Sequence, residues 1–117
     1  MDIKDLVFEG LASTAFTGGA TMNPKTGEKV TTGFATGGFR EYKYANPTLA
    51  DLDEIHADVA RMVEALPECM VGFWMHKGML YIDAVKVFED ENTARVIGKA
   101  MNEISIFDLG TNTEITL

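Results

Sequence analysis

Glycine and threonine crowd one stretch near the beginning of the chain, and this stretch limits the folds available to it. Residues 10–38 hold seven of the eleven glycines and seven threonines, but only three charged residues. Glycine weakens helices and permits turns and close backbone approaches, whereas threonine favours strands. The stretch is therefore predicted to be either a plain β-hairpin or a surface on which main-chain amides meet a ligand.

A turn divides this stretch in two. Within residues 23–28, Pro24 suits the second position of a type I turn and Gly27 suits a left-handed residue after it. The flanking segments 16–22 and 29–39 are rich in Thr, Val and Phe. We expect these segments to pair as a hairpin, with bulges or irregular loops at the paired glycines.

Two helices are expected further along. Between Thr48 and Leu66 the apolar residues recur on one helical face, Thr48 can cap the N-terminus with Asp51, and Pro67 ends the helix. A shorter helix follows, capped by Asp90 or Asn92 and with Ala94, Ile97 and Met101 on one face.

The other ordered segments are predicted to be strands. They are residues 3–11, 69–75, 79–88, 104–109 and 114–117, in addition to the two strands of the hairpin. A turn at residues 76–78 is expected between the strands 69–75 and 79–88. The resulting order is β-β-β-α-β-β-α-β-β. Because hairpins predominate, we expect one α+β domain over residues 1–117, with a mainly antiparallel sheet and both helices packed against it.

Charge and composition exclude several function classes. The formal net charge is −8, with ten scattered Lys and Arg residues, which disfavours binding to extended nucleic acid. No window is apolar enough for a membrane span, and no signal peptide is visible. Cys69 is the single cysteine, so no disulfide can form within one chain. These features predict a protein of the cytoplasm with no membrane partner.

No catalytic or metal-ligating pattern is recognisable. The two serines and two histidines fall in separate segments without the spacing of a triad or of metal ligands. Asp83 and Asp108 each interrupt an apolar strand. They could lie on a solvated face, cap turns or form an acid–base pair, and the sequence leaves these alternatives open. We therefore expect a protein that is not an enzyme and has no metal or cofactor.

A ligand-binding site is expected around the glycine-rich stretch. Trp74, the single tryptophan, is either a packing residue or a platform for a planar ring. Arg40 is either a phosphate contact or half of a surface ion pair, and the amide of Asn102 either ends a helix or contacts an adenine edge. The candidate ligand-binding residues are Phe16, Gly18, Gly19, Asn23, Phe34, Arg40, Trp74, Arg95 and Asn102.

Three segments together resemble a known family. They are the loop at 18–28 with Thr-Gly-Phe-Ala at 32–35, then Gly72-Phe73-Trp74 followed by Leu80-Tyr81-Ile82-Asp83, and finally residues 102–109 followed by Glu114-Ile115. This set resembles the first-described family of Thoeris anti-defence proteins, which phages make against a bacterial immune system. The chain has Asn102-Glu103 where the family pattern has Asn-Gln, and Asp83-Ala84-Val85 where it has Asp-Val-Ser.

The resemblance implies a phage-encoded sponge in the host cell. Such a protein captures cyclic ADP-ribose isomers, and in some members cyclic trinucleotides, without cleaving them. It also implies a homo-oligomer with ligand sites between subunits. The alternative is an interaction or inhibitor module without a small-molecule ligand, whose acidic surface meets a basic protein partner. A small hydrolase acting through Asp83 or Asp108 is a third possibility.

Overall fold

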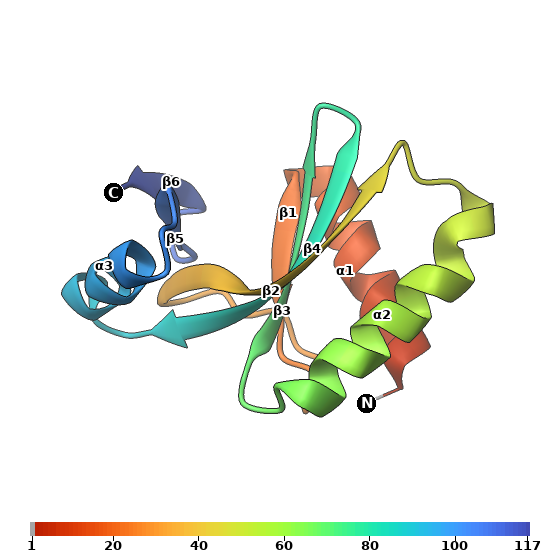
Figure 1. The fold of residues 1–117 in the computed structure, drawn as a ribbon, viewed down its shortest axis with the longest axis horizontal. Coiled ribbons are helices and arrows are strands. Elements are labelled where there is room, and N and C mark those ends of the chain that lie inside the picture. The colour runs from red at the N-terminus through yellow and green to blue at the C-terminus, as the bar shows by residue number, and fades with distance from the viewer. Residues whose placement is uncertain (1) are drawn as a thin grey trace.

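The computed structural model describes residues 2–117, in which one curled sheet of six strands is combined with three helices (Figure 1). Every strand pairing is antiparallel, so the predicted α+β class with a mainly antiparallel sheet is confirmed. The elements are α1 (Ile3–Thr17), β1 (Gly19–Met22), β2 (Phe34–Ala45), a 3-10 turn η1 (Leu49–Asp51), α2 (Leu52–Ala65), β3 (Met70–His76), β4 (Met79–Phe88), α3 (Glu91–Ala100), β5 (Ser105–Asp108) and β6 (Thr113–Thr116).

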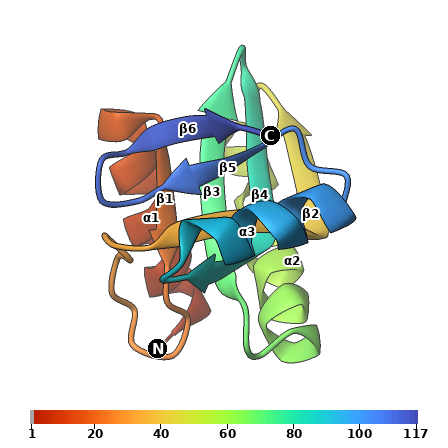
Figure 2. The same ribbon diagram turned by 90° about the vertical axis from the view of Figure 1, so that its left-hand side faces the viewer.

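The sheet has the strand order β1-β3-β4-β2-β5-β6. Strand β2 pairs with β4 along most of its length, and its first residues also pair with β5. The β2–β4 register shifts between Thr36 and Arg40, where Gly37 and Gly38 form the expected irregularity. Figures 1 and 2 show α1 and α2 on one side of the sheet, and α3 with β5 and β6 as a separate lobe on the other side.

The first element is a helix, and the strand expected over residues 3–11 is wrong. Asp2 caps its N-terminus by accepting a hydrogen bond from the Lys4 amide at 2.8 Å. The buried residues of this segment lie on one side of the helix and are Leu6, Val7, Gly10 and Thr14. Their spacing is that of a helix and not the alternation of a strand. Residues 2–117 therefore contain three helices instead of two, and Gly10 lies in the middle of the first one.

The hairpin expected between residues 16–22 and 29–39 is also wrong. The turn itself is present, because the Gly27 amide donates to the Asn23 carbonyl at 2.7 Å and Gly27 has a positive φ. The two flanks, however, pair only next to the turn, through the bridge between Met22 and Lys29 and a hydrogen bond from the Val30 amide to the Thr21 carbonyl at 2.7 Å. Strand β1 pairs with β3 along its whole length, and β2 runs on to Ala45 beside β4.

Three local predictions are confirmed. Thr48 and Asp51 form a capping box at the start of the second helical segment, and Asp90 caps α3. The β3–β4 hairpin turns at Lys77 and Gly78, both of which have positive φ angles. Each of these features depends on residues within a few positions of one another, so the sequence carries the complete signal.

The main core lies between the sheet and the helix pair α1 and α2. Its largest fully buried side chains include Leu6, Ile55, Met62, Leu80 and Ile82. A smaller apolar region lies under α3, where the Thr36 hydroxyl donates to the Ala94 carbonyl at 3.1 Å beside buried Ile106. The thiol of Cys69 is free and buried. Within residues 2–117, none of the helices is long and apolar enough to cross a membrane.

Candidate functional site

Strands β1, β3, β4 and β2 have one face that points away from α1 and α2, and we call it the open face. Because side chains alternate along a strand, residues that neighbour the buried Phe73 and Ile82 point away from α1 and α2. The cross-strand register places these residues in two rows. One row contains Gly19, Trp74, Tyr81 and Lys43, and the next contains Thr21, Gly72, Asp83 and Glu41.

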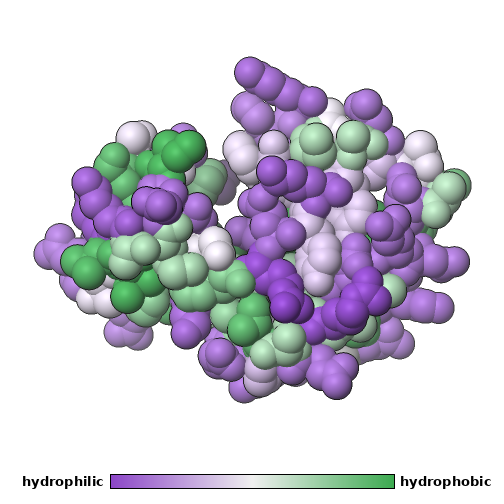
Figure 3. Space-filling view, viewed as in Figure 1, coloured by the Kyte–Doolittle hydropathy of each residue, from purple (hydrophilic) through white to green (hydrophobic). Residues whose placement is uncertain are grey.

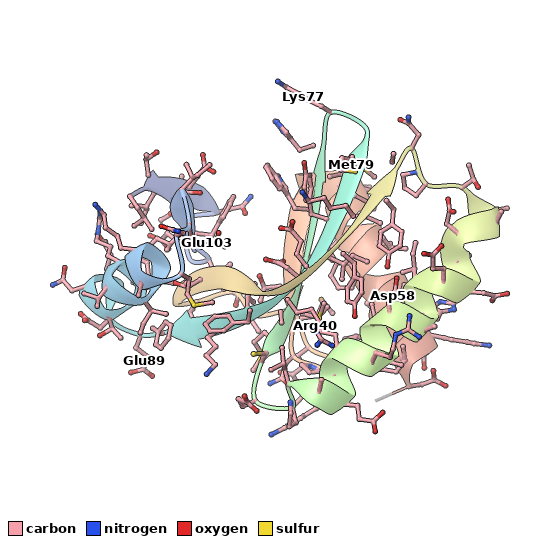
Figure 4. The ribbon with its side chains drawn as sticks, in the orientation of Figure 1. Arg40, Asp58, Lys77, Met79, Glu89 and Glu103 are labelled. Atoms are coloured by element: carbon pink, nitrogen blue, oxygen red, sulfur yellow. The ribbon has the colours of Figure 1, made fainter. Side chains whose placement is uncertain are left out.

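The open face looks across a recess to the lobe formed by α3, β5 and β6. Figure 3 shows a notch in the surface between this lobe and the sheet. In Figure 4, Glu103 lies on the lobe, whereas Lys77 and Met79 lie at the tip of the β3–β4 hairpin on the sheet. The recess thus has an aromatic and acidic wall from the sheet and a second acidic wall from the turn that follows α3.

Aromatic rings form a ladder around Trp74, with Tyr81 in the same row and His76 two residues farther along β3. The Trp74 ring stacks on the His76 ring, with centroids 4.8 Å apart and planes inclined by 16°. On the other strand, the Tyr81 centroid lies 5.1 Å from that of Trp74, and the Lys43 ammonium lies 5.8 Å from the Tyr81 ring. Gly19 is the cross-strand neighbour of Trp74 on β1, so no side chain stands beside the indole there. This ladder is the kind of surface on which a planar ring can stack.

The carboxylate of Asp83 is held between two glycines. It lies against Gly72 of β3 and Gly37 of the β2 irregularity, and a methyl group at Gly72 would be 2.5 Å from Asp83 Oδ1. A methyl group at Gly37 would also come within 3.1 Å of Glu103 Oε1. Gly37 and Gly72 are therefore needed for close packing around a carboxylate, a reason that the local sequence does not reveal.

Three acidic side chains meet at this point. Burial, and then repulsion from the neighbouring charges of Glu41 and Glu103, together raise the pKa of Asp83 to about 7. The pKa of Glu103 is also raised, mainly by burial and then by Glu41. Near neutral pH, Asp83 therefore exists partly as the neutral acid, which can donate a hydrogen bond as well as accept one.

Four of the residues expected to bind a ligand gather where α1 leads into β1. Gly18 ends α1 in the left-handed conformation, and its carbonyl accepts a hydrogen bond from the Met75 amide at 3.0 Å. Gly19 pairs with Trp74, which is 38 % exposed. Phe16, in the last turn of α1, is 91 % exposed. The structure thus places Phe16, Gly18, Gly19 and Trp74 near one end of the open face.

Of the other five expected residues, four lie elsewhere, and Asn102 precedes Glu103 in the turn after α3. Asn23 accepts hydrogen bonds from backbone amides in its own turn, and Arg95 donates to Glu91 at 2.8 Å. Arg40 is opposite Ala84, on the face that α2 covers (Figure 4). Phe34 begins β2 between β4 and β5, and Asn102 follows α3 with a positive φ. A ligand-binding role for these residues stays a prediction.

The side chains of Ser105, His76 and His56 lie in separate parts of the structure. The Ser105 hydroxyl donates to Glu114 at 2.9 Å, His76 stacks on Trp74, and His56 lies on the other side of the sheet. Asp108 accepts hydrogen bonds from the amides of Gly110 and Thr111, so it holds a turn. Among residues 2–117, no group of three acidic, histidine or cysteine side chains is arranged to hold a metal ion.

Sequence reasoning missed Glu41, Glu103 and the aromatic partners of Trp74. The tight turn sets the register of the β3–β4 hairpin, and this register places Trp74 opposite Tyr81. The pair could therefore have been predicted from the sequence. No local signal could have brought Glu103 to Asp83, since that contact depends on how the lobe folds back over the sheet.

Comparison with known proteins adds no relative. No protein-family model, no curated protein and no solved structure matches the chain.

Proposed function

We propose that the protein is a non-enzymatic binder that captures a small cyclic nucleotide signal in the recess of the open face. The ligand class is a cyclic ADP-ribose isomer, with cyclic trinucleotides as a related class. In this proposal, a phage makes the protein and it acts in the cytoplasm of the host cell, where sequestration of the signal blocks an immune response. The proposal is supported by the resemblance of the sequence and by the exposed aromatic ladder around Trp74.

The aromatic ladder suits the base of such a ligand. Stacking of a base on an aromatic side chain contributes about 1–3 kcal/mol. Gly19, the cross-strand neighbour of Trp74 on β1, has no side chain that could block a ring stacked on the indole. The exocyclic amino group and ribose hydroxyls are hydrogen-bond donors, and Glu41, Glu103 and ionised Asp83 are acceptors on the neighbouring walls.

The phosphates of the ligand require positively charged partners, and few cations lie in the recess. Lys43 stands at the end of the aromatic row, but its ammonium also lies 3.6 Å from the Glu41 carboxylate. A second subunit that contributes cations across the open side of the recess would complete the site. We therefore propose a homo-oligomer in which the recess of one subunit is closed by another.

Ligand capture and release test this function. The protein is incubated with a cyclic ADP-ribose isomer, separated from free ligand and heat-denatured, and the released material is analysed by mass spectrometry. We expect depletion of the ligand from solution and release of the intact molecule. Release of an altered molecule would identify an enzyme instead, and no depletion with any isomer would exclude sequestration of this ligand class.

The single tryptophan provides a direct measure of stacking. Because Trp74 is the only tryptophan, binding of a base beside it should quench the intrinsic fluorescence of the protein in a saturable way. Trp74→Leu should weaken binding by roughly tenfold or more, the equivalent of one lost stacking contact. Affinity is measured by calorimetry, since this variant has no tryptophan signal. Val96→Ser, an exposed position on α3, is the control, and equal affinity in both variants would remove Trp74 from the site.

A further inference from the structure

The lobe is joined to the rest of the sheet through a narrow two-stranded ribbon. Strand β4 pairs with β3 only as far as Val85, which lies opposite Met70. Beyond that point, residues 86–88 of β4 pair with residues 34–36 at the start of β2, and Figure 1 shows the lobe attached to this ribbon. Because two strands resist bending less than a wide sheet does, the ribbon is a place about which the lobe can turn.

The irregularity in β2 lies at the inner end of this ribbon. The β2–β4 register shifts between Thr36 and Arg40, and Gly38 has a φ of 90°. On one side of the shift, Thr36 donates to the Ala94 carbonyl of α3, and on the other side Arg40 lies opposite Ala84 in the main sheet. A break in the ladder at a glycine can absorb a change of φ and ψ, so this point has the properties of a hinge.

Glu103 brings a carboxylate of the lobe to this hinge. Its amide donates to the Gly98 carbonyl at 2.9 Å, which holds Glu103 in the turn after α3. Its side chain lies over two glycines of the hinge, because methyl groups at Gly37 and Gly38 would each be 3.1 Å from atoms of its carboxyl group. Asp83 of the main sheet lies against the same Gly37. Carboxyl groups of the lobe and of the sheet are therefore neighbours across the hinge.

Asp83 and Glu103 lie in a cluster of negative charge. Glu41 of β2 is the cross-strand neighbour of Asp83, whereas β1 and β3 contribute only uncharged residues to this row. Among residues 2–117, no lysine or arginine forms an ion pair with Asp83 or Glu103, and Lys43 pairs with Glu41. Burial, and then repulsion within the cluster, raise the pKa of Asp83 to about 7 and also raise the pKa of Glu103.

We propose that the lobe and the sheet form a pH-sensitive hinge, which closes the recess while Asp83 is protonated and opens it when Asp83 and Glu103 are both ionised. In the open form, water surrounds both carboxyl groups and their pKa values are about 4. The closed form binds protons more strongly, so proton binding favours closure. Closure is therefore most favourable below about pH 4, weakens as the pH rises to about 7, and is weakest above pH 7. The inference does not depend on which ligand the recess binds.

The distance between two spin labels tests this movement. The substitutions Ala45→Cys, at an exposed position at the end of β2, and Val96→Cys, at an exposed position on α3, provide the labelling sites. Cys69 is buried, and mass spectrometry verifies that only the two new cysteines carry a label. Labelled protein is diluted with unlabelled protein, so that double electron–electron resonance measures distances within one chain. We expect a longer mean distance and a broader distribution at pH 9 than at pH 5.

Two further variants identify the groups responsible. Asp83→Asn and Glu103→Gln each keep the shape of the side chain and remove one charge from the cluster. In both variants the distance should change with pH much less than in the parent, and Asp83→Asn should retain the short distance at pH 9. Glu89→Gln removes an exposed carboxylate just after β4 and should leave the lengthening of the parent unchanged. Far-UV circular dichroism verifies that every variant is folded at both pH values.

Three results would overturn the proposal. The same distance at both pH values in the parent would show that the lobe does not move. An equal lengthening in the parent, Asp83→Asn and Glu103→Gln would show that other groups cause the movement. A lengthening accompanied by loss of the circular dichroism signal would indicate general unfolding instead of a hinge. None of these results bears on capture of a nucleotide, which is measured separately.

Discussion

Replacing Asp83 by asparagine should make the protein more stable than the parent above pH 7, by about 2–4 kcal/mol. In the folded protein the pKa of Asp83 is raised from 3.8 to about 7, first by burial and then by repulsion from Glu41 and Glu103. Asp83 ionises near pH 4 in the unfolded chain, but only at about pH 7 in the folded protein. The loss of folding stability caused by ionised Asp83 is therefore absent below pH 4, grows between pH 4 and 7, and is complete above pH 7.

Urea denaturation at pH 5 and pH 8 measures this effect. The parent should lose stability between the two pH values, whereas Asp83→Asn should lose much less, and the two proteins should agree most closely at pH 5. Glu64→Gln removes an exposed carboxylate from α2 and should change stability by only about 0.5 kcal/mol or less. A parent that is as stable at pH 8 as at pH 5 would show that Asp83 is not held in the acidic cluster.

Gly10→Ala should destabilise the protein by about 1–3 kcal/mol, although alanine is the better helix former. Gly10 lies within α1 and faces the buried ring of Phe73 on β3. A methyl group at this position would lie 2.6 Å from Phe73 Cδ2, well inside van der Waals contact. The ring is enclosed by the core and cannot move aside without displacing its neighbours.

Two further variants identify overpacking as the cause. Ala57→Gly on the exposed side of α2 should cost about 1 kcal/mol, the ordinary preference of a helix for alanine. Phe73→Leu should reduce the additional cost of Gly10→Ala, because the two sites share one contact and their effects are not additive. Thermal or urea denaturation measures the parent, the three single variants and the Gly10→Ala/Phe73→Leu double variant. A Gly10→Ala variant more stable than the parent would contradict the packing of α1 on β3.

The acidic cluster also has consequences for the proposed ligand. At neutral pH the neutral form of Asp83 can donate a hydrogen bond, whereas at higher pH the same group is a third negative charge beside Glu41 and Glu103. An anionic nucleotide is expected to be repelled more strongly when all three carboxylates are ionised. The recess is therefore better suited to such a ligand near pH 7 than at pH 8 or above.

The sequence by itself determined the elements whose signals are local. The capping box at Thr48, the cap at Asp90 and the β3–β4 turn each involve residues within a few positions of one another, and together they predict an antiparallel α+β fold. The glycine-rich stretch predicted the turn at Asn23–Gly27 for the same reason.

Only the tertiary structure decided how that stretch is used. Gly10 lies in a helix, and its missing side chain makes room for the ring of Phe73, far along the chain. Strand β1 pairs with β3 instead of with the strand that follows it. Gly37 and Gly72 come from different strands, yet both make room for the carboxylate of Asp83. Contacts between distant segments depend on the packing of the whole sheet, and composition and spacing do not encode them separately.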